Sequence, residues 1–241
     1  VKYAVAEGFT TALVMGDEHD IMGVDSRTGL SKAEAVFQSR RRAYFLDQGV
    51  TLQAADTVYF SYDTEIEPDV VVEPHCVFGL DVKIAKGSII KAFSHLEGAI
   101  IGENGVIGPF ARLRPGTELH ENVKIGNFVE IKKAVISQSA KVNHLSYIGD
   151  AEIGAGANIG AGTITCNCDG FNKHKTEIGA GAFIGSNTSL IAPITIEAGA
   201  YVGSSSALSA NVEADALIVT RAPVRVLKGW AKKFRDKNTK G

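Results

Sequence analysis

Seven polar residues interrupt a stretch of the chain in which most other positions are small or aliphatic. They are Arg112, Arg114, Glu130, Lys132, His144, Tyr147 and Asn158. Arg114 and Lys132 lie eighteen residues apart, which is one full turn of the repeat described below. The two cations would then stack about 4.8 Å apart along the axis of the fold, where they repel each other unless an anion lies between them. This spacing predicts a phosphate-binding site.

His144 is the histidine that is best placed for proton transfer. It lies a short distance beyond the two cations, and Tyr147 follows it by three residues. A neutral imidazole can take a proton from a nucleophile at neutral pH, so His144 is a candidate general base. We interpret four other histidines as surface or structural residues, namely His19, His75, His95 and His120.

A polar segment further along the chain contains Cys166, Cys168 and His174. Two ligands separated by a single residue fit a tetrahedral zinc site poorly, so metal binding is the weaker interpretation of this segment. The three cysteines of the chain are odd in number, and two of them are only two positions apart. A disulfide framework is therefore not indicated.

The element that must position these residues is a repeat of six. Between Ile66 and Leu208 an aliphatic residue recurs at nearly every sixth position, and glycine often follows it. One run reads Ile101, Ile107, Leu113, Leu119, Ile125 and Ile131. This period is typical of a parallel β-helix, in which each aliphatic side chain points inward and stacks on its equivalent one coil away. Three hexads per coil would give roughly eight coils, and the residues flanking each aliphatic position would point outward.

The repeat has one large interruption, from Thr165 to Ile178. A solenoid accommodates an insertion only as a loop that projects from the stack, so residues 166–175 are predicted to project. Loops on a rigid scaffold often carry function. Steps of five residues, such as that from Ile131 to Ile136, are small enough to be absorbed at a corner.

Two segments precede the repeat. Residues 1–27 show a strand-like alternation of apolar residues that is too short to close a core. From Ser31 to about Gln48 the pattern becomes helical, with Ser31 and Glu34 as a predicted capping box. Gly49 is predicted to stop this helix.

The bulk properties exclude several classes of partner. The chain has 241 residues, 45% of them hydrophobic, and a formal net charge of −2. This charge predicts neither a nucleic-acid nor a membrane partner, and the basic residues after Leu208 have no accompanying row of aromatic residues. No apolar run approaches the roughly 20 residues of a membrane-spanning helix, so we expect a cytoplasmic protein.

Five ordered motifs resemble one known family. They read GPFARLRPG (108–116), GNFVEIKK (126–133), NHLSYIGD (143–150), NIGAGTITCN (158–167) and GSN (185–187). These motifs are similar to those of the bacterial bifunctional N-acetylglucosamine-1-phosphate uridylyltransferase/glucosamine-1-phosphate N-acetyltransferases, over residues 23–230. The resemblance implies four parts: a remnant of an α/β uridylyltransferase domain (1–27), a helical linker (28–50), an all-β left-handed β-helix acetyltransferase domain (51–210) and a basic tail that completes the acetyl-CoA site (211–241).

The resemblance also implies an activity. Acetyl-CoA would be the co-substrate, and the acetyl group would go to the amine of glucosamine-1-phosphate, on the route to UDP-N-acetylglucosamine, peptidoglycan and lipopolysaccharide. Acetyl transfer would need no cofactor, whereas uridylyl transfer in the family needs Mg²⁺. The nucleotide-binding start of the uridylyltransferase domain is not in the sequence, so we expect acetyl transfer alone. The family implies a homotrimer with active sites between subunits.

Single residues receive roles from the same resemblance. The acceptor site would comprise Arg114, Lys132, Tyr147, Asn158 and Lys173. His144 would be the general base, with Glu130 as a candidate to orient it. The acetyl-CoA path would comprise Ala161, Asn167, Cys168, Ser186, Ser204 and Arg221. Asp25 would be a Mg²⁺ ligand of the truncated uridylyltransferase site.

Two residues depart from the family pattern. Cys168 stands where the family usually has tyrosine, so an aromatic contact to acetyl-CoA is lost and weaker binding is expected. Asp25 stands where the family usually has asparagine, and it could still ligate a hard cation. Three rival interpretations stay open: a hexapeptide acyltransferase for another amine or hydroxyl, a β-helical metal hydratase that uses three histidines, and a scaffold without catalytic activity.

Overall fold

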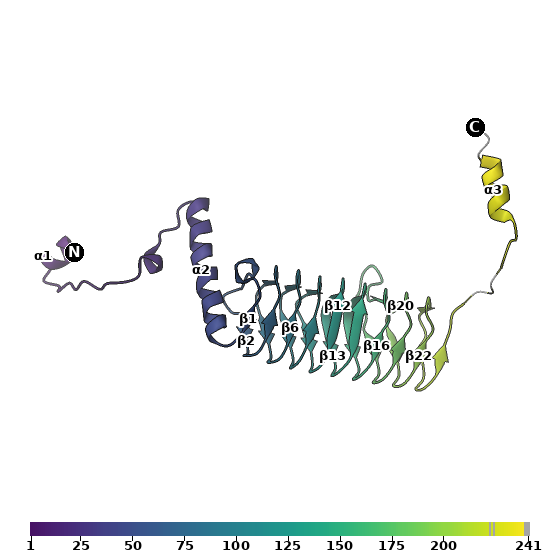
Figure 1. The fold of residues 1–241 in the computed structure, drawn as a ribbon. Coiled ribbons are helices and arrows are strands. Elements are labelled where there is room, and N and C mark those ends of the chain that lie inside the picture. Colours follow the sequence, from purple (N-terminus) through teal and green to yellow (C-terminus); the bar gives the residue numbers. More distant parts are fainter. Residues whose placement is uncertain (222, 224, 239–241) are drawn as a thin grey trace.

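The chain forms one long solenoid of short parallel strands. The computed structural model describes residues 1–221, 223 and 225–238. Figure 1 shows helix α2 (Arg27–Asp47) beside the first coils and helix α3 (Trp230–Asn238) beyond the last. Among the described residues, no helix has both the length and the apolar character that a membrane crossing requires.

Ten parallel strands make the first sheet, and neighbouring strands in it come from successive coils of the solenoid. In spatial order they are β1 (Thr51–Leu52), β3 (Val71–Val72), β6 (Ile89–Ile90), β9 (Val106–Ile107), β12 (Lys124–Asn127), β14 (Lys141–His144), β16 (Asn158–Ile159), β19 (Phe183–Ile184), β22 (Tyr201–Val202) and β24 (Leu217–Ile218). Strand β24 pairs with β22, so the solenoid extends to Ile218, past the expected boundary at residue 210. The expected tail (211–241) includes residues 222, 224 and 239–241, which lie outside the described residues.

The second sheet covers the other two faces. Its strands are β2 (Glu65–Ile66), β4 (Val77–Phe78), β5 (Val82–Ile84), β7 (His95–Leu96), β8 (Ala99–Ile101), β10 (Arg112–Leu113), β11 (Thr117–Leu119), β13 (Glu130–Ile136), β15 (Tyr147–Ile153), β17 (Ile164–Cys166), β18 (Thr176–Ile178), β20 (Ser189–Ile191), β21 (Ile194–Ile196) and β23 (Ala207–Leu208). Strand β13 pairs with both β10 and β11, and β15 pairs with both β17 and β18. These two long strands carry the sheet around a corner.

The core is the stack of aliphatic residues that the repeat predicted. Leu113 pairs with Ile131, and Ile131 pairs with Ile148 on the next coil. All three side chains are 0% exposed. Burying one such side chain contributes about 1.5–3 kcal/mol, so the stack stabilises every coil. The predicted parallel β-helix is confirmed.

The N-terminal segment is not strand-like. It contains α1 (Lys2–Ala6) and a 3₁₀ helix, η1 (Glu18–Ile21), and residues 1–27 contain no strand. Its apolar side chains are exposed, with Leu13 at 88%. The prediction from alternation was wrong because a strand needs a neighbour for its backbone groups, and none lies beside this segment in Figure 1.

Helix α2 begins earlier than predicted. Its N-cap is Ser26, whose hydroxyl accepts a hydrogen bond from the Gly29 amide at 3.0 Å. Ser31 therefore lies inside the helix, and the capping box predicted at Ser31 and Glu34 was wrong. The predicted stop is correct, since Gly49 adopts the left-handed conformation with φ 86° that a helix end favours.

A buried glutamine docks α2 on the solenoid. Gln38 donates to the Phe60 carbonyl at 2.7 Å and accepts from the Phe60 amide at 2.9 Å. Phe45 is 1% exposed, and its ring centroid lies 4.6 Å from that of Phe60. A short 3₁₀ helix, η2 (Ala55–Thr57), follows in the first coil. Helix α2 is therefore fixed to the start of the stack.

Candidate active site

His144 lies at the end of β14 and points outward into a shallow groove. Asn127 is its register partner on the preceding coil, and Asn127 Oδ1 lies 2.6 Å from His144 Nδ1. Gly108, Pro109 and Asn143 also line the groove. With Asn127 Oδ1 as the acceptor, Nδ1 carries the proton and Nε2 is the basic nitrogen. A neutral ring of this kind could accept a proton.

Within one chain, Asn127 rather than Glu130 contacts His144. Glu130 pairs in register with Arg112 and Tyr147, on the far side of the corner at Leu145 (φ 51°). Its carboxylate lies 2.8 Å from Arg114 and 3.8 Å from Arg112. Within one chain, Glu130 therefore does not contact His144, because the coil spacing places Asn127 below it, and the orienting role of Glu130 stays a prediction.

A column of residues continues from His144 along the same corner. The amides of Gly162, Asn187 and Ser205 donate to the carbonyls of His144, Ala161 and Ser186, respectively. His144, Ala161, Ser186 and Ser204 thus occupy equivalent places on successive coils. Four residues that the resemblance assigns to the base and the acetyl-CoA path form one line parallel to the axis.

A second cluster lies across the corner. Leu113 pairs with Ile131, so Arg114 and Lys132 lie on neighbouring coils, as their spacing predicts. Part of the expected repulsion is offset by Glu130, which pairs with Arg114. In the part of the chain that the structure describes, Lys132 makes no ion pair. Arg112, Arg114 and Lys132 outnumber Glu130, and the cluster is therefore an anion-attracting surface.

Tyr147 joins the second cluster through strand pairing. It is the partner of Glu130 on the next coil, and both line a groove that also contains Arg112, Phe128 and Leu145. Asn158 lies instead on β16, in the sheet that carries His144. Arg221 is exposed beyond β24, so the structure of one chain does not bring it to either cluster.

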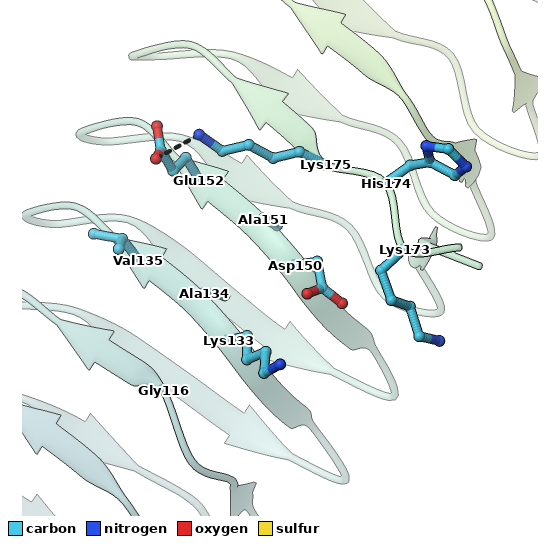
Figure 2. A pocket seen from close by; sticks show the side chains of 10 residues that line it. All are labelled: Gly116, Lys133, Ala134, Val135, Asp150, Ala151, Glu152, Lys173, His174 and Lys175. Atoms are coloured by element: carbon cyan, nitrogen blue, oxygen red, sulfur yellow. Dashed lines mark hydrogen bonds and ion pairs between the residues drawn. The ribbon is translucent and has the colours of Figure 1, made fainter. Parts of the chain in front are cut away.

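The inserted segment projects between β17 and β18, as predicted, and presents Lys173. Lys173 lines a groove of about 420 Å³ with Lys133, Asp150 and Lys175. Figure 2 shows its side chain beside Asp150, whereas Lys175 reaches Glu152. Lys175 lies 2.6 Å from Glu152 and 3.1 Å from Glu177, and these two contacts hold the end of the loop against the solenoid.

Cys168 lies opposite Lys173 in this loop, in an isolated antiparallel bridge. A hydrogen bond from the Gly170 amide, followed by one from Lys173, lowers the pKa of the Cys168 thiol, and the same thiol raises the pKa of Lys173. Asp169 closes the loop tip, since the amides of Phe171 and Asn172 donate to it. The exposed Cys168 is therefore part of an ordered loop.

The described side chains that could ligate a metal ion do not lie close together. Within residues 1–221, 223 and 225–238, no group of three or more His, Cys, Asp or Glu side chains could hold a metal ion. His174 lies 2.8 Å from Asp169 rather than beside the cysteines. Asp25 is exposed just before α2. The residues present therefore do not form the Mg²⁺ site suggested for Asp25.

Two residues of the site were missed in the sequence. Asn127 orients His144, and Asp150 accepts a hydrogen bond from Asn167. Both lie seventeen residues from their partners, because a five-residue step shortens the coil there. Counting back seventeen residues, rather than eighteen, from His144 and Asn167 identifies both.

Comparisons with known proteins agree with this architecture. Residues 98–133 match the family described as bacterial transferase hexapeptide (six repeats). The bifunctional protein GlmU of Zymomonas mobilis is 53% identical over 240 residues, which cover 100% of this chain and 53% of that protein. GlmU of Sphingopyxis alaskensis is 52% identical, over 98% of this chain and 52% of that protein. The chain spans about half the length of these relatives.

Solved structures show the same fold at low sequence identity. LpxA from Acinetobacter baumannii superposes with a TM-score of 0.57 at 17% identity, over 77% of each chain. LpxA from Bacteroides fragilis, a UDP-N-acetylglucosamine acyltransferase, superposes with a TM-score of 0.60 at 18% identity, over 70% of this chain and 71% of that one.

The solenoid and its repeat define an enzyme of the hexapeptide-repeat transferase class, with the left-handed parallel β-helix fold. Within that class, the chain belongs with the bacterial bifunctional GlmU proteins and corresponds to about half of their length.

Proposed function

We propose that the chain transfers an acetyl group from acetyl-CoA to the amine of glucosamine-1-phosphate. The observation that carries this proposal is the outward column that begins at His144, across one corner of the solenoid from an anion-attracting cluster that contains Arg114 and Lys132. A base and a site for a phosphate are the two features that this acceptor needs. The similarity of the whole chain to GlmU proteins supports the same activity.

The chemistry follows from the two features. The neutral amine attacks the thioester carbonyl, and the developing ammonium loses its proton to Nε2 of His144, which Asn127 holds in the basic tautomer. The C–N bond forms, the C–S bond breaks, and the thiolate of CoA leaves and is protonated. Lys132 and Arg114 bind the phosphate and so hold the amine in place. The His144–Ala161–Ser186–Ser204 column offers acetyl-CoA an extended path to this point.

We further propose that the complete site lies between copies of the chain in a homotrimer. In one chain, His144 and Arg112 line different grooves on opposite sides of the Leu145 corner, and Arg114 and Lys132 line neither of these two grooves. A second copy packed along the corner would bring its cationic cluster toward His144 of the first. Because neither groove contains both His144 and the pair Arg114 and Lys132, catalysis would depend on assembly.

A ladder of exposed rings along this corner supports that packing. The rings of His75, Phe93, Phe110 and Phe128 stack with centroids 4.9, 4.9 and 5.2 Å apart. All four residues have φ between 54° and 60°, a conformation that costs a bulky residue about 1–2 kcal/mol. Phe93, Phe110 and Phe128 are nevertheless 51%, 45% and 54% exposed. Such an apolar row is typical of an interface.

The activity is tested by mixing the protein with acetyl-CoA and glucosamine-1-phosphate and following free thiol. We expect thiol release that depends on both substrates, with N-acetylglucosamine-1-phosphate as the product by mass spectrometry. Thiol release with another amine or a hydroxyl acceptor, but not with glucosamine-1-phosphate, would instead identify an acyltransferase of different specificity.

Replacing Lys132 should weaken binding of the phosphate-bearing substrate. A charge-assisted hydrogen bond is worth about 1.5–3 kcal/mol, so Lys132→Met should raise the KM for glucosamine-1-phosphate roughly 10- to 100-fold. The KM for acetyl-CoA should change little. Lys86→Met is the control, because Lys86 is an exposed lysine that pairs with Glu103 near the first coils. Equal effects of the two variants would remove Lys132 from the phosphate site.

Replacing one aromatic ring of the exposed row should weaken trimer formation. Phe128→Ser removes apolar contact area from the corner without touching the core, so a larger monomer fraction is expected by light scattering after gel filtration. Thiol release should fall in parallel. Phe171→Ser is the control, since Phe171 is 96% exposed on the inserted loop. A fully active monomer would contradict the composite site.

A further inference from the structure

We infer that Asp150 is a positioning residue that locks the side-chain amide of Asn167, so that only the amide oxygen is left for a bound ligand. This inference rests on the proposed acetyl transfer for the identity of the ligand. The lock itself rests on contacts within the chain.

The lock is a hydrogen bond between neighbouring coils. Asn167 is 5% exposed, and its Nδ2 donates to Asp150 Oδ2 at 2.5 Å. The same nitrogen lies 3.4 Å from the hydroxyl of Tyr147. A carboxylate only accepts hydrogen bonds, so an amide turned by 180° would place two oxygens together. Asp150 therefore allows Asn167 only one orientation.

The local backbone is shaped for this contact. Asp150 has φ 49°, a left-handed conformation that aspartate tolerates better than most residues. It follows Gly149, where a Cβ would overlap the Tyr147 hydroxyl and the Asn167 amide. The Thr165 hydroxyl accepts from the Gly149 amide at 2.8 Å. These constraints bring Tyr147, Asp150 and Asn167 together.

Asn167 is also the base of the inserted loop. The backbone amide of Asn167 donates to the Thr165 carbonyl, and the backbone carbonyl of Asn167 accepts from the His174 amide, both at 2.9 Å. The loop thus leaves and returns at Asn167, with Lys173 carried on the returning side. The backbone of Asn167 thus fixes the base of the loop that carries Lys173, while Asp150 fixes the side-chain amide of the same residue.

The locked amide defines the chemistry of what it can bind. In the described part of the chain, the Asn167 oxygen makes no hydrogen bond with protein, while its nitrogen is committed to Asp150. The remaining acceptor fits an N–H group. Both substrates of the proposed reaction have such groups, namely the amine of glucosamine-1-phosphate and the amides of acetyl-CoA.

The test is Asp150→Asn, which keeps the shape of the side chain but lets it donate as well as accept. Asn167 is then no longer restricted to one orientation. We expect the KM of the substrate that meets Asn167 to rise about tenfold, the equivalent of a hydrogen bond to a charged group. The melting temperature should change little. Asp69→Asn is the matched control, because Asp69 is an exposed aspartate with φ 62°.

A second readout needs no activity. In the wild-type protein, the side-chain NH₂ protons of Asn167, assigned by their loss in Asn167→Asp, should exchange slowly with solvent. Asp150→Asn should make that exchange at least several-fold faster. If wild-type protein releases no thiol, the proposed function fails, but the exchange measurement still tests the lock.

The outcomes are distinct. A rise confined to the KM for acetyl-CoA supports the inference and assigns Asn167 to the donor. A rise confined to glucosamine-1-phosphate supports it and assigns Asn167 to the acceptor. Unchanged KM values overturn the positioning role, even if the melting temperature falls, and unchanged amide exchange overturns the lock.

Discussion

His144→Ala is expected to lower kcat for acetyl transfer by about 10²- to 10⁴-fold, the usual effect of losing a general base. The KM values for both substrates should change much less, because the phosphate and CoA contacts lie on other residues. The side chain of His144 is exposed and supports no core contact, so assembly should be unaffected. Steady-state thiol release, with gel filtration in parallel, measures both quantities.

His120→Ala is the control for this experiment. His120 is another surface histidine, beside Glu118 at 3.4 Å, and its removal should leave kcat unchanged. A companion variant, Asn127→Ala, should lower kcat by a smaller factor because the ring keeps its nitrogen but loses its orientation. An unaltered kcat in His144→Ala would assign the base to a different residue.

Gly126→Ala is expected to produce the largest loss of stability from a single methyl group. A Cβ at this position would overlap the carbonyl oxygen of Asn143 on the next coil. Backbone cannot move aside as a flexible side chain can, so β12 and β14 would have to separate. Overpacking of this kind costs about 1–3 kcal/mol or more. Because Asn127 and His144 follow directly in these strands, kcat should fall with the free energy of unfolding.

Denaturant unfolding measures the first effect and thiol release the second. Gly156→Ala is the control that separates overlap from backbone strain. Gly156 has φ 67° but meets no atom within 4 Å, so its substitution should cost only the strain of about 1–2 kcal/mol and should spare kcat. Equal losses in the two variants would mean that overlap with Asn143 is not the cause.

The fold could be predicted from the sequence because one physical requirement recurs in every coil. Each inward position, such as Leu113 or Ile131, must be aliphatic to fill the core. The projecting loop was predictable for a related reason, since the step of thirteen residues from Thr165 to Ile178 is too long for a turn between two stacked strands. In a regular six-residue repeat, one interval of a different length is easy to recognise.

The parts that could not be predicted depend on contacts between distant residues. Residues 1–27 alternate like a strand, but alternation does not show whether a neighbouring strand exists. Glu130 and Asn127 were both close enough in sequence to His144 to orient it. Only the register between β12 and β14 shows that Asn127 is the one beside His144 within a single chain. Polar residues share a groove only when they lie on the same side of the corner. The backbone conformation of Leu145 sets where that corner lies.

The docking of α2 through Gln38 and Phe45 has a consequence for growth of the solenoid. A stack of coils ends in strands whose backbone groups have no partner on one side, and such edges can recruit further chains. Terminal units of a repeat array therefore need a covering element. A charged or small residue at Phe45 would loosen that cover and leave the first coil open to end-to-end polymerisation. Fibre formation, rather than unfolding, would then limit the lifetime of the protein in concentrated solution.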